Sequence, residues 1–193
     1  VDRRWMREAA ATPANDLLNS RIRDVAGGLR RGGGYLWPSP DKWAGGTTQD
    51  LMLGKDRILR AGRGTYCCGV TLETFWRGWL AYAKDYSVPF MGGITLAQAR
   101  ELQRAWFCIG TRKGALDALV PPGLGVEVAA ADARPGDFAQ FWRASGLGHS
   151  VMVLGVAQNR ISYFSTQRST NGIGSTTEPL PAETYVVRPV VPS

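Results

Sequence analysis

The chain changes its hydrophobic period about two thirds of the way along, and this change limits the folds open to it. Up to about residue 120, apolar residues recur three or four positions apart in several segments, which predicts amphipathic helices. Beyond that point the apolar segments are short, alternating and rich in β-branched or aromatic residues, which predicts strands. Helices followed by a run of strands favour an α+β fold with the two kinds of element in separate layers.

The predicted helices have recognisable beginnings and ends. One covers ANDLLNSRIRDVAGGLRR (residues 14–31), one begins near Cys67 and ends before Pro89, and one follows Thr95. Thr95 with Gln98 three residues later is a capping-box pattern. A further short helix is expected at residues 50–59, inside a turn-rich stretch that runs from 32 to 64. Two of these helices are expected to pack on a sheet.

Strands are expected in DFAQFWR, SVMVLGV, RISYFST and TYVVRPV, which would give three or four strands of an antiparallel sheet. A chain of 193 residues fits one domain, 1–193. It would consist of an N-terminal helical segment (1–31), a loop-rich and helical part (32–120) and a β-meander (121–193). No membrane span is expected, because no apolar run approaches the roughly 18 residues that a spanning helix needs.

The formal net charge of +7 favours a polyanionic partner, such as an acidic protein or polymer. Nucleic acid is not the expected partner, because the basic residues are scattered and form no compact basic and aromatic motif. A metal site is not expected either. With one histidine, no CxxC pair and no HExxH motif, the ligands of a structural zinc are missing.

Three cysteines cannot all pair within one chain, and two of them, Cys67 and Cys68, are neighbours at the head of a predicted helix. The positive end of a helix lowers the pKa of a thiol and can also stabilise an oxyanion. At helical spacing Cys68 lies on the apolar stripe that continues through Leu72, whereas Cys67 lies on a more polar side. Cys67 is therefore the predicted nucleophile and Cys68 a packing residue, with the opposite assignment left open. Cys108, within AWFCIG, is expected to be a core residue.

A thiol nucleophile needs a base and a group that orients the base. The single histidine, His149, stands behind the Gly-rich turn SGLG at the start of a predicted strand. The next strand ends in Ser165, Thr166 and Gln167, of which the first and last follow His149 by 16 and 18 residues. In a two-strand meander this spacing can bring those side chains beside the imidazole. Gln167 is predicted to orient His149, and Ser165 to do so more weakly; a solvent-facing Gln167 is the alternative.

Three short segments resemble one known family. Cys67-Cys68-Gly69-Val70 resembles the Cys-Ser-Gly-hydrophobe signature of the NlpC/P60 group within the papain-like superfamily. RPGDFAQFW followed by GHSVMVLG is similar to the group's Pro-Gly-Asp strand and the Gly-His strand after it, and GGYLWP is similar to its Tyr-x-Trp-Gly segment. The chain departs from the pattern at Tyr66, where Asp is common, at Cys68 in place of serine, and at Gln167 in place of the frequent histidine.

The resemblance implies a papain-like core in which a nucleophile helix packs on an antiparallel sheet. It implies a cysteine peptidase or amidase that cuts amide bonds in peptidoglycan stem peptides, needs no cofactor, and is secreted, periplasmic or associated with the cell wall. The catalytic residues would be Cys67, His149 and Gln167, and Tyr35 and Ser165 would contact the substrate. Two alternatives stay open: a toxin-like deamidase or acyltransferase acting on a protein glutamine, and a binding module without turnover. Nothing in the sequence indicates the oligomeric state.

Overall fold

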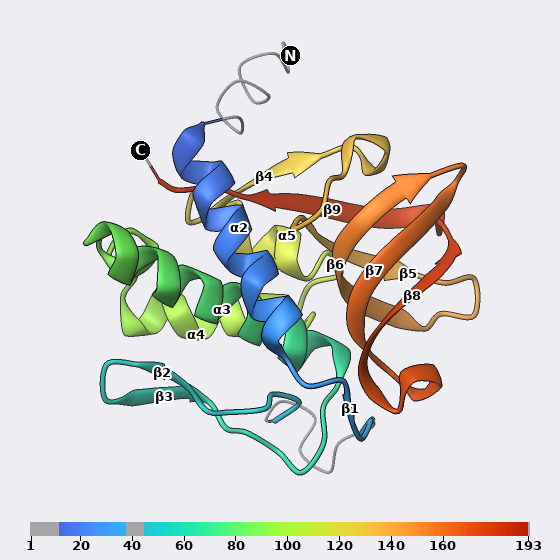
Figure 1. Ribbon diagram of the computed structural model, residues 1–193, viewed down its shortest axis with the longest axis horizontal. Helices are drawn as coiled ribbons and strands as arrows, with labels where there is room; N and C mark the ends of the chain where they lie inside the picture. The colour runs from blue at the N-terminus through green and yellow to red at the C-terminus, as the bar shows by residue number, and fades with distance from the viewer. Residues whose placement is uncertain (1–11, 38–44, 193) are drawn as a thin grey trace.

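The computed structural model describes residues 12–37 and 45–192, which form a group of helices on one side of a curved antiparallel sheet (Figure 1). The first eleven residues of the N-terminal segment lie outside the described residues. The helices are α2 (Pro13–Gly28), α3 (Cys67–Tyr86), α4 (Leu96–Trp106) and α5 (Ala115–Leu119), with single 3-10 turns η1 (Phe90–Gly92), η2 (Ala130–Asp132) and η3 (Arg168–Thr170).

All neighbouring strands of the large sheet run antiparallel, in the order β1-β8-β7-β6-β5-β9-β4. The strands are β1 (Gly32–Gly33), β4 (Gly125–Val128), β5 (Phe138–Trp142), β6 (Gly148–Ala157), β7 (Arg160–Gln167), β8 (Gly172–Pro179) and β9 (Glu183–Pro189). The predicted α+β class with an antiparallel sheet is therefore confirmed. The sheet has more strands than the three or four predicted.

The strand alternation divides the core into two layers. On β6, Met152 faces the helices and joins the larger apolar cluster, whereas its neighbours Val151 and Val153 face the opposite side of the sheet. The same alternation on β7 places Phe164 with the helices and Tyr163 on the opposite side. Both faces of the central strands are thus buried, which explains their nearly continuous apolar sequence.

Helix α3 is the element that joins the two halves of the chain. Its apolar stripe is fully buried, with no solvent exposure for Leu72, Phe75, Trp76 and Trp79, and the helix contacts β6 and β7. It ends at Ser87, which has the left-handed φ of 53°, two residues before Pro89. Helix α2 crosses α3 closely, as Figure 1 shows. The predicted end of α3 before Pro89 and the capping box of Thr95 and Gln98 at the start of α4 are both confirmed.

Two details of the predicted layout are wrong. Residues 50–59 form a hairpin, β2 (Leu51–Leu53) and β3 (Asp56–Leu59), and not a helix. Gly54 turns the chain there with a φ of +58°, a conformation that no α-helix contains. The second correction concerns α4, which was expected to pack on the sheet together with α3. It packs mainly against α3, α5 and β3. Of the two helices, α3 is the one that lies on β6 and β7.

A buried carboxylate fixes the segment after residue 45 to α3. Glu73 is fully buried and accepts hydrogen bonds from the Thr48 backbone N–H (2.6 Å) and hydroxyl (2.5 Å), and it pairs with Arg77 at 2.9 Å. We expect Glu73→Ala to lower the free energy of unfolding by about 2–4 kcal/mol, because it leaves these donors unpaired. Urea unfolding measures this loss. Glu101→Ala on the exposed side of α4 is the control and should change stability by less than about 0.5 kcal/mol.

Candidate active site

The beginning of α3 is held between two other segments. Thr65 forms β-bridges with both Tyr35 and Gly46, and the Tyr66 backbone N–H donates to the carbonyl of Gly46 at 3.4 Å. Tyr66 then takes an extended conformation (φ −144°, ψ 167°), and the helix begins at Cys67 without a side-chain cap. The first N–H groups of a helix have no acceptor within the helix, so an uncapped start leaves donors available to another group.

Cys67 meets the sheet where two central strands separate. The ladder between β6 and β7 begins at the pair Met152–Phe164, although β6 extends back to Gly148 and β7 continues to Gln167. At this separated end the hydroxyl of Ser165 donates a hydrogen bond to the backbone carbonyl of Ser150 at 2.7 Å. This bond satisfies the Ser150 carbonyl, which has no partner in the β6–β7 ladder. The first turn of α3 lies against this gap.

The surroundings of Cys67 favour its thiolate form. Its pKa lies well below the ordinary thiol value, because of a hydrogen bond with the Cys68 thiol, then a hydrogen bond with His149 and its charge, and then the Ser150 backbone N–H. Burial acts in the opposite direction and is outweighed. The residue is nevertheless partly exposed to solvent. Such a setting is typical of a reactive cysteine.

The neighbouring thiol has the opposite character. The Cys68 sulfur lies 3.8 Å from that of Cys67 and 3.3 Å from the Ser150 hydroxyl, which in turn donates to Gln140 at 2.6 Å. The hydrogen bond with Cys67 and burial both raise the pKa of Cys68 well above the ordinary value. Cys68 also packs against the main apolar cluster, as its place on the helical stripe predicts.

Cys108 is not the core residue that its sequence context predicts. It is partly exposed and stands just after α4, in a left-handed conformation with φ 57°. Its backbone N–H donates to Ala105 and that of Ile109 donates to Arg104, which is the Schellman arrangement of a helix end. Burial raises the pKa of Cys108 to about 12, so this thiol stays protonated near neutral pH.

His149 is held mainly by aromatic rings. The side chain has only 5% exposure and lies edge-on to Phe141 and Tyr163, with ring centroids 5.7 and 5.4 Å away. Tyr163 is fixed in turn by its hydroxyl, which donates to Glu178 at 3.1 Å, and Glu178 is paired with Arg143 at 2.7 Å. The Nε2 atom of His149 is buried and has no hydrogen-bond partner among the described residues.

The predicted partners of His149 do not form hydrogen bonds with it. Gln167 stands at the end of β7, where its Nε2 donates to Thr170 at 2.9 Å and its buried Oε1 has no partner within the described ranges. The predicted hydrogen bond between Gln167 and the imidazole is therefore not formed in this structure. Ser165 has no solvent exposure and its hydroxyl is engaged by the Ser150 carbonyl, so it does not orient His149 and is closed to a substrate.

Tyr35 is placed beside the cysteines by its bridge to Thr65. Burial is the main cause that raises its pKa, and the charge of Cys67 adds to the effect, whereas Arg168 and Arg143 act in the opposite direction. The exposed ring of Trp37, two residues further on, packs against Tyr66 with a centroid distance of 5.3 Å. Tyr35 and Trp37 thus lie on the segment that borders the start of α3.

Several groups that shape this site were not predicted from the sequence. Ser150 and Gln140 support Cys68, and Phe141 and Tyr163 enclose His149. Their positions depend on the pairing of β5, β6 and β7, which a single sequence does not specify. In the part of the chain that the structure describes, no cluster of three or more His, Cys, Asp or Glu side chains could hold a metal ion.

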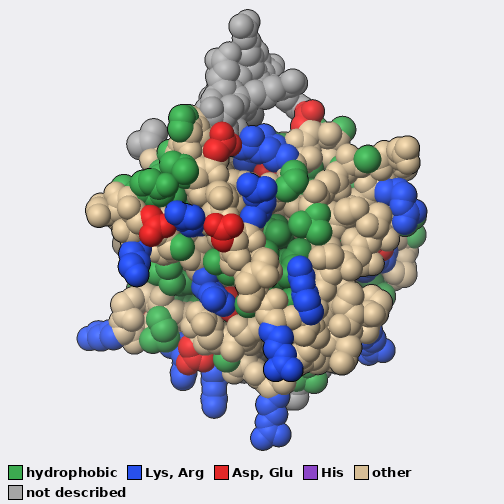
Figure 2. Space-filling model, viewed as in Figure 1, with side chains coloured by type: hydrophobic (Ala, Val, Ile, Leu, Met, Phe, Trp, Pro, Cys, Tyr) green, Lys and Arg blue, Asp and Glu red, His purple; other side chains and the backbone are tan. Residues whose placement is uncertain are grey.

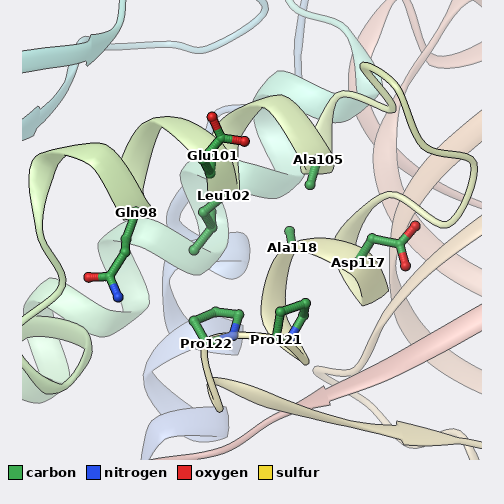
Figure 3. Close-up of a pocket in the computed structure, with 8 residues that line it drawn as sticks. All are labelled: Gln98, Glu101, Leu102, Ala105, Asp117, Ala118, Pro121 and Pro122. Atoms are coloured by element: carbon green, nitrogen blue, oxygen red, sulfur yellow. The ribbon is translucent and has the colours of Figure 1, made fainter.

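A separate cavity of about 400 Å³ lies between α4 and α5 (Figure 3). Leu102, Ala105, Ala118, Pro121 and Pro122 form its apolar lining, with Gln98, Glu101 and Asp117 completing it. None of the predicted site residues lines this cavity. The candidate site is therefore defined by the contacts of Cys67 and not by the cavity.

Comparison with known proteins does not identify the chain: no known protein family matches it, and no curated protein or solved structure is detectably similar to it. Membership of the NlpC/P60 group stays a prediction from the short segments described above. The chemical interpretation must therefore come from the geometry of this site.

Proposed function

We propose that the protein is a cysteine hydrolase that cleaves an amide bond with Cys67 as nucleophile and His149 as the acid and base. The observation that carries the proposal is the lowered pKa of Cys67 at the uncapped start of a long helix, to which His149 and the Ser150 N–H contribute. A nucleophile that is stabilised as a thiolate beside a histidine is the arrangement that acyl transfer requires.

The reaction would proceed in two steps. The Cys67 thiolate attacks the carbonyl carbon of the amide, and a backbone N–H of Cys67 or Cys68 donates to the oxygen that becomes negative. The His149 imidazolium gives its proton to the nitrogen of the leaving amine, and the C–N bond breaks to leave a thioester. Neutral His149 then removes a proton from water, which attacks the thioester and releases the acid and the Cys67 thiolate. Because Nε2 is enclosed, Nδ1 is the nitrogen assigned to these transfers.

Peptidoglycan stem peptides are the proposed substrate, on a papain-like core of the NlpC/P60 kind. The predicted family segments converge on one place, since Tyr35 borders the start of α3 and His149 lies on the strand that meets it. The net charge of +7 suits an anionic polymer, and Figure 2 shows Lys and Arg side chains spread over one face and projecting from its lower edge. Among the described residues, no helix is both long and apolar enough to cross a membrane.

The deciding experiment compares products. The protein is incubated with purified peptidoglycan and, separately, with glutamine-rich proteins, and new amino groups and ammonia are measured in each sample. New amino groups from peptidoglycan that disappear in His149→Ala support the proposal. Ammonia released only from protein glutamine indicates the deamidase alternative, and wild-type protein that gives neither product contradicts the hydrolase proposal and leaves the binding module.

Cys67 and Cys108 should differ in reactivity. At pH 7 we expect iodoacetamide to alkylate Cys67 at least about tenfold faster than Cys108, because the pKa of Cys67 is lowered and that of Cys108 is raised to about 12. Peptide mass spectrometry over a time course measures both rates. Denatured protein is the control, in which the two thiols should react at similar rates. Equal rates in the folded protein would contradict the assignment of Cys67.

Gln167 should matter less than His149. Since the amide of Gln167 is bonded to Thr170 and the imidazole is held by Phe141 and Tyr163, Gln167→Ala is expected to reduce kcat less than about tenfold. His149→Ala should reduce it by about 10³-fold or more. Steady-state kinetics on the same substrate compare the two variants. A loss in Gln167→Ala as large as that in His149→Ala would restore Gln167 as the orienting residue.

A further inference from the structure

The two adjacent thiols at the start of α3 differ in their polar contacts. The Cys68 sulfur has two polar neighbours, the Cys67 sulfur at 3.8 Å and the Ser150 hydroxyl oxygen at 3.3 Å. Both distances are within reach of an S–H donor. Packing alone does not account for a thiol placed between two polar atoms of the candidate site.

The direction of these hydrogen bonds follows from Ser150. The hydroxyl of Ser150 donates its single proton to the Gln140 Oε1 atom, at the short distance of 2.6 Å. Its oxygen can therefore only accept a hydrogen bond from Cys68. The Cys68 S–H is thus a donor with two acceptors within reach, the oxygen of Ser150 and the sulfur of Cys67.

The charge on Cys67 decides between the two acceptors. When Cys67 is a neutral thiol, the oxygen of Ser150 is the better acceptor and is closer. When Cys67 is a thiolate, a hydrogen bond to it is charge-assisted and is about twice as strong as a neutral one. The S–H of Cys68 then turns toward Cys67 without any movement of the backbone.

We propose that Cys68 is a positioning residue that stabilises the Cys67 thiolate by donating a hydrogen bond to it, while Ser150 and Gln140 hold the Cys68 side chain in place. This inference rests on the proposed function, because it assumes that the thiolate of Cys67 is the reacting species. Cys68 would thus stabilise the thiolate in addition to His149, whose Nε2 atom has no hydrogen-bond partner among the described residues.

The other titratable groups around Cys67 are few, so the contribution of Cys68 can be separated from theirs. His149 interacts with Cys67 from β6, Tyr35 from the segment after β1, and Cys108 from the end of α4. Arg143 and Arg168 act on Tyr35. A substitution at Cys68 leaves these residues in place, but it also removes the effect that Cys68 has on the pKa of Tyr35.

The test measures the rate of Cys67 alkylation by iodoacetamide from pH 5 to 10 in four proteins. They are the wild type, Cys68→Ala, Cys68→Ser and the control Cys108→Ser. The tryptic peptide of residues 64–77 contains Cys67 and Cys68, and its fragment ions separate the two sites in the wild type. Thermal unfolding of each variant shows whether it is folded.

We expect the midpoint of the pH profile to rise by about one pH unit in Cys68→Ala, so that alkylation slows roughly tenfold at pH values below both midpoints. Cys68→Ser retains a donor and should keep the midpoint within about 0.3 units of the wild type, as should Cys108→Ser. If Cys68→Ala does not fold, the inference requires that Cys68→Ser keeps the acidic midpoint.

An unchanged midpoint in Cys68→Ala, or the same rise in Cys68→Ser as in Cys68→Ala, overturns the inference. Hydrolysis measured on the same samples separates this failure from that of the proposed function. If His149→Ala abolishes hydrolysis while Cys68→Ala leaves the midpoint unchanged, the role of Cys68 alone is wrong. If the wild-type midpoint is that of an ordinary thiol and no hydrolysis occurs, both proposals are wrong.

Discussion

Replacement of Cys67 by alanine is expected to reduce hydrolysis by a factor of at least about 10⁴, because the variant has no group that can form the thioester. The fold should be unaffected, since the side chain is small and partly exposed. The measurement is kcat on the substrate that the product assay identifies, with the temperature of thermal unfolding taken on the same sample.

The matched variant is Cys68→Ala, which removes the adjacent thiol and leaves the nucleophile. Near pH 9, where an ordinary thiol is largely ionised, it should retain activity within about tenfold of the wild type. An inactive Cys68→Ala together with an active Cys67→Ala would show that the nucleophile is the second cysteine. That result would shift the assignment by one residue.

The second large effect is expected at Gly69, in the first turn of α3. A Cβ atom there would lie 2.3 Å from both the carbonyl carbon and oxygen of Gly46, and backbone atoms cannot rotate away as a side chain can. Gly69→Ala should therefore lower the free energy of unfolding by about 2–3 kcal/mol and reduce Tm by roughly 5–10 °C. Calorimetry measures both quantities.

Gly27→Ala is the control for this prediction. Gly27 is also helical, near the end of α2, and a Cβ atom added there has no neighbour within 4 Å. Alanine should stabilise the protein at this position by about 0.5–1 kcal/mol, because it restricts the unfolded chain. Opposite signs for the two substitutions would establish the close backbone contact, and a stabilising Gly69→Ala would contradict it.

The parts of the fold that were predictable are those with strong local signals. The stripe of α3, the capping box of α4 and the apolar strands β5, β6, β7 and β9 were all evident in the sequence. Strand β8 (GIGSTTEP) was missed because it is polar and contains Gly and Pro, and only its ladder with β7 makes it a strand. In DLMLGKDRIL, apolar residues seven and eight positions apart imitate a helix, although Gly54 turns the chain.

The candidate site was predictable to the extent that residue types determine chemistry. One histidine and a cysteine at a helix start restricted the choice to a few residues, and the structure brings Cys67 and His149 together. The third position was not predictable from spacing. The number of residues between His149 and Gln167 predicted that Gln167 lies at the end of the next strand, and it is the last residue of β7. The direction of its amide depends on the η3 turn, where the Thr170 hydroxyl accepts its hydrogen bond.

The contact between Gly69 and Gly46 also bears on what happens when a substrate binds. With Thr48 bonded to Glu73 and Gly46 pressed against Gly69, the first turns of α3 are fixed against their neighbour before any substrate arrives. Under the proposed function, the entropy of placing Cys67 is therefore lost during folding and not in each turnover. The helix side of the candidate site is thus rigid before any ligand binds.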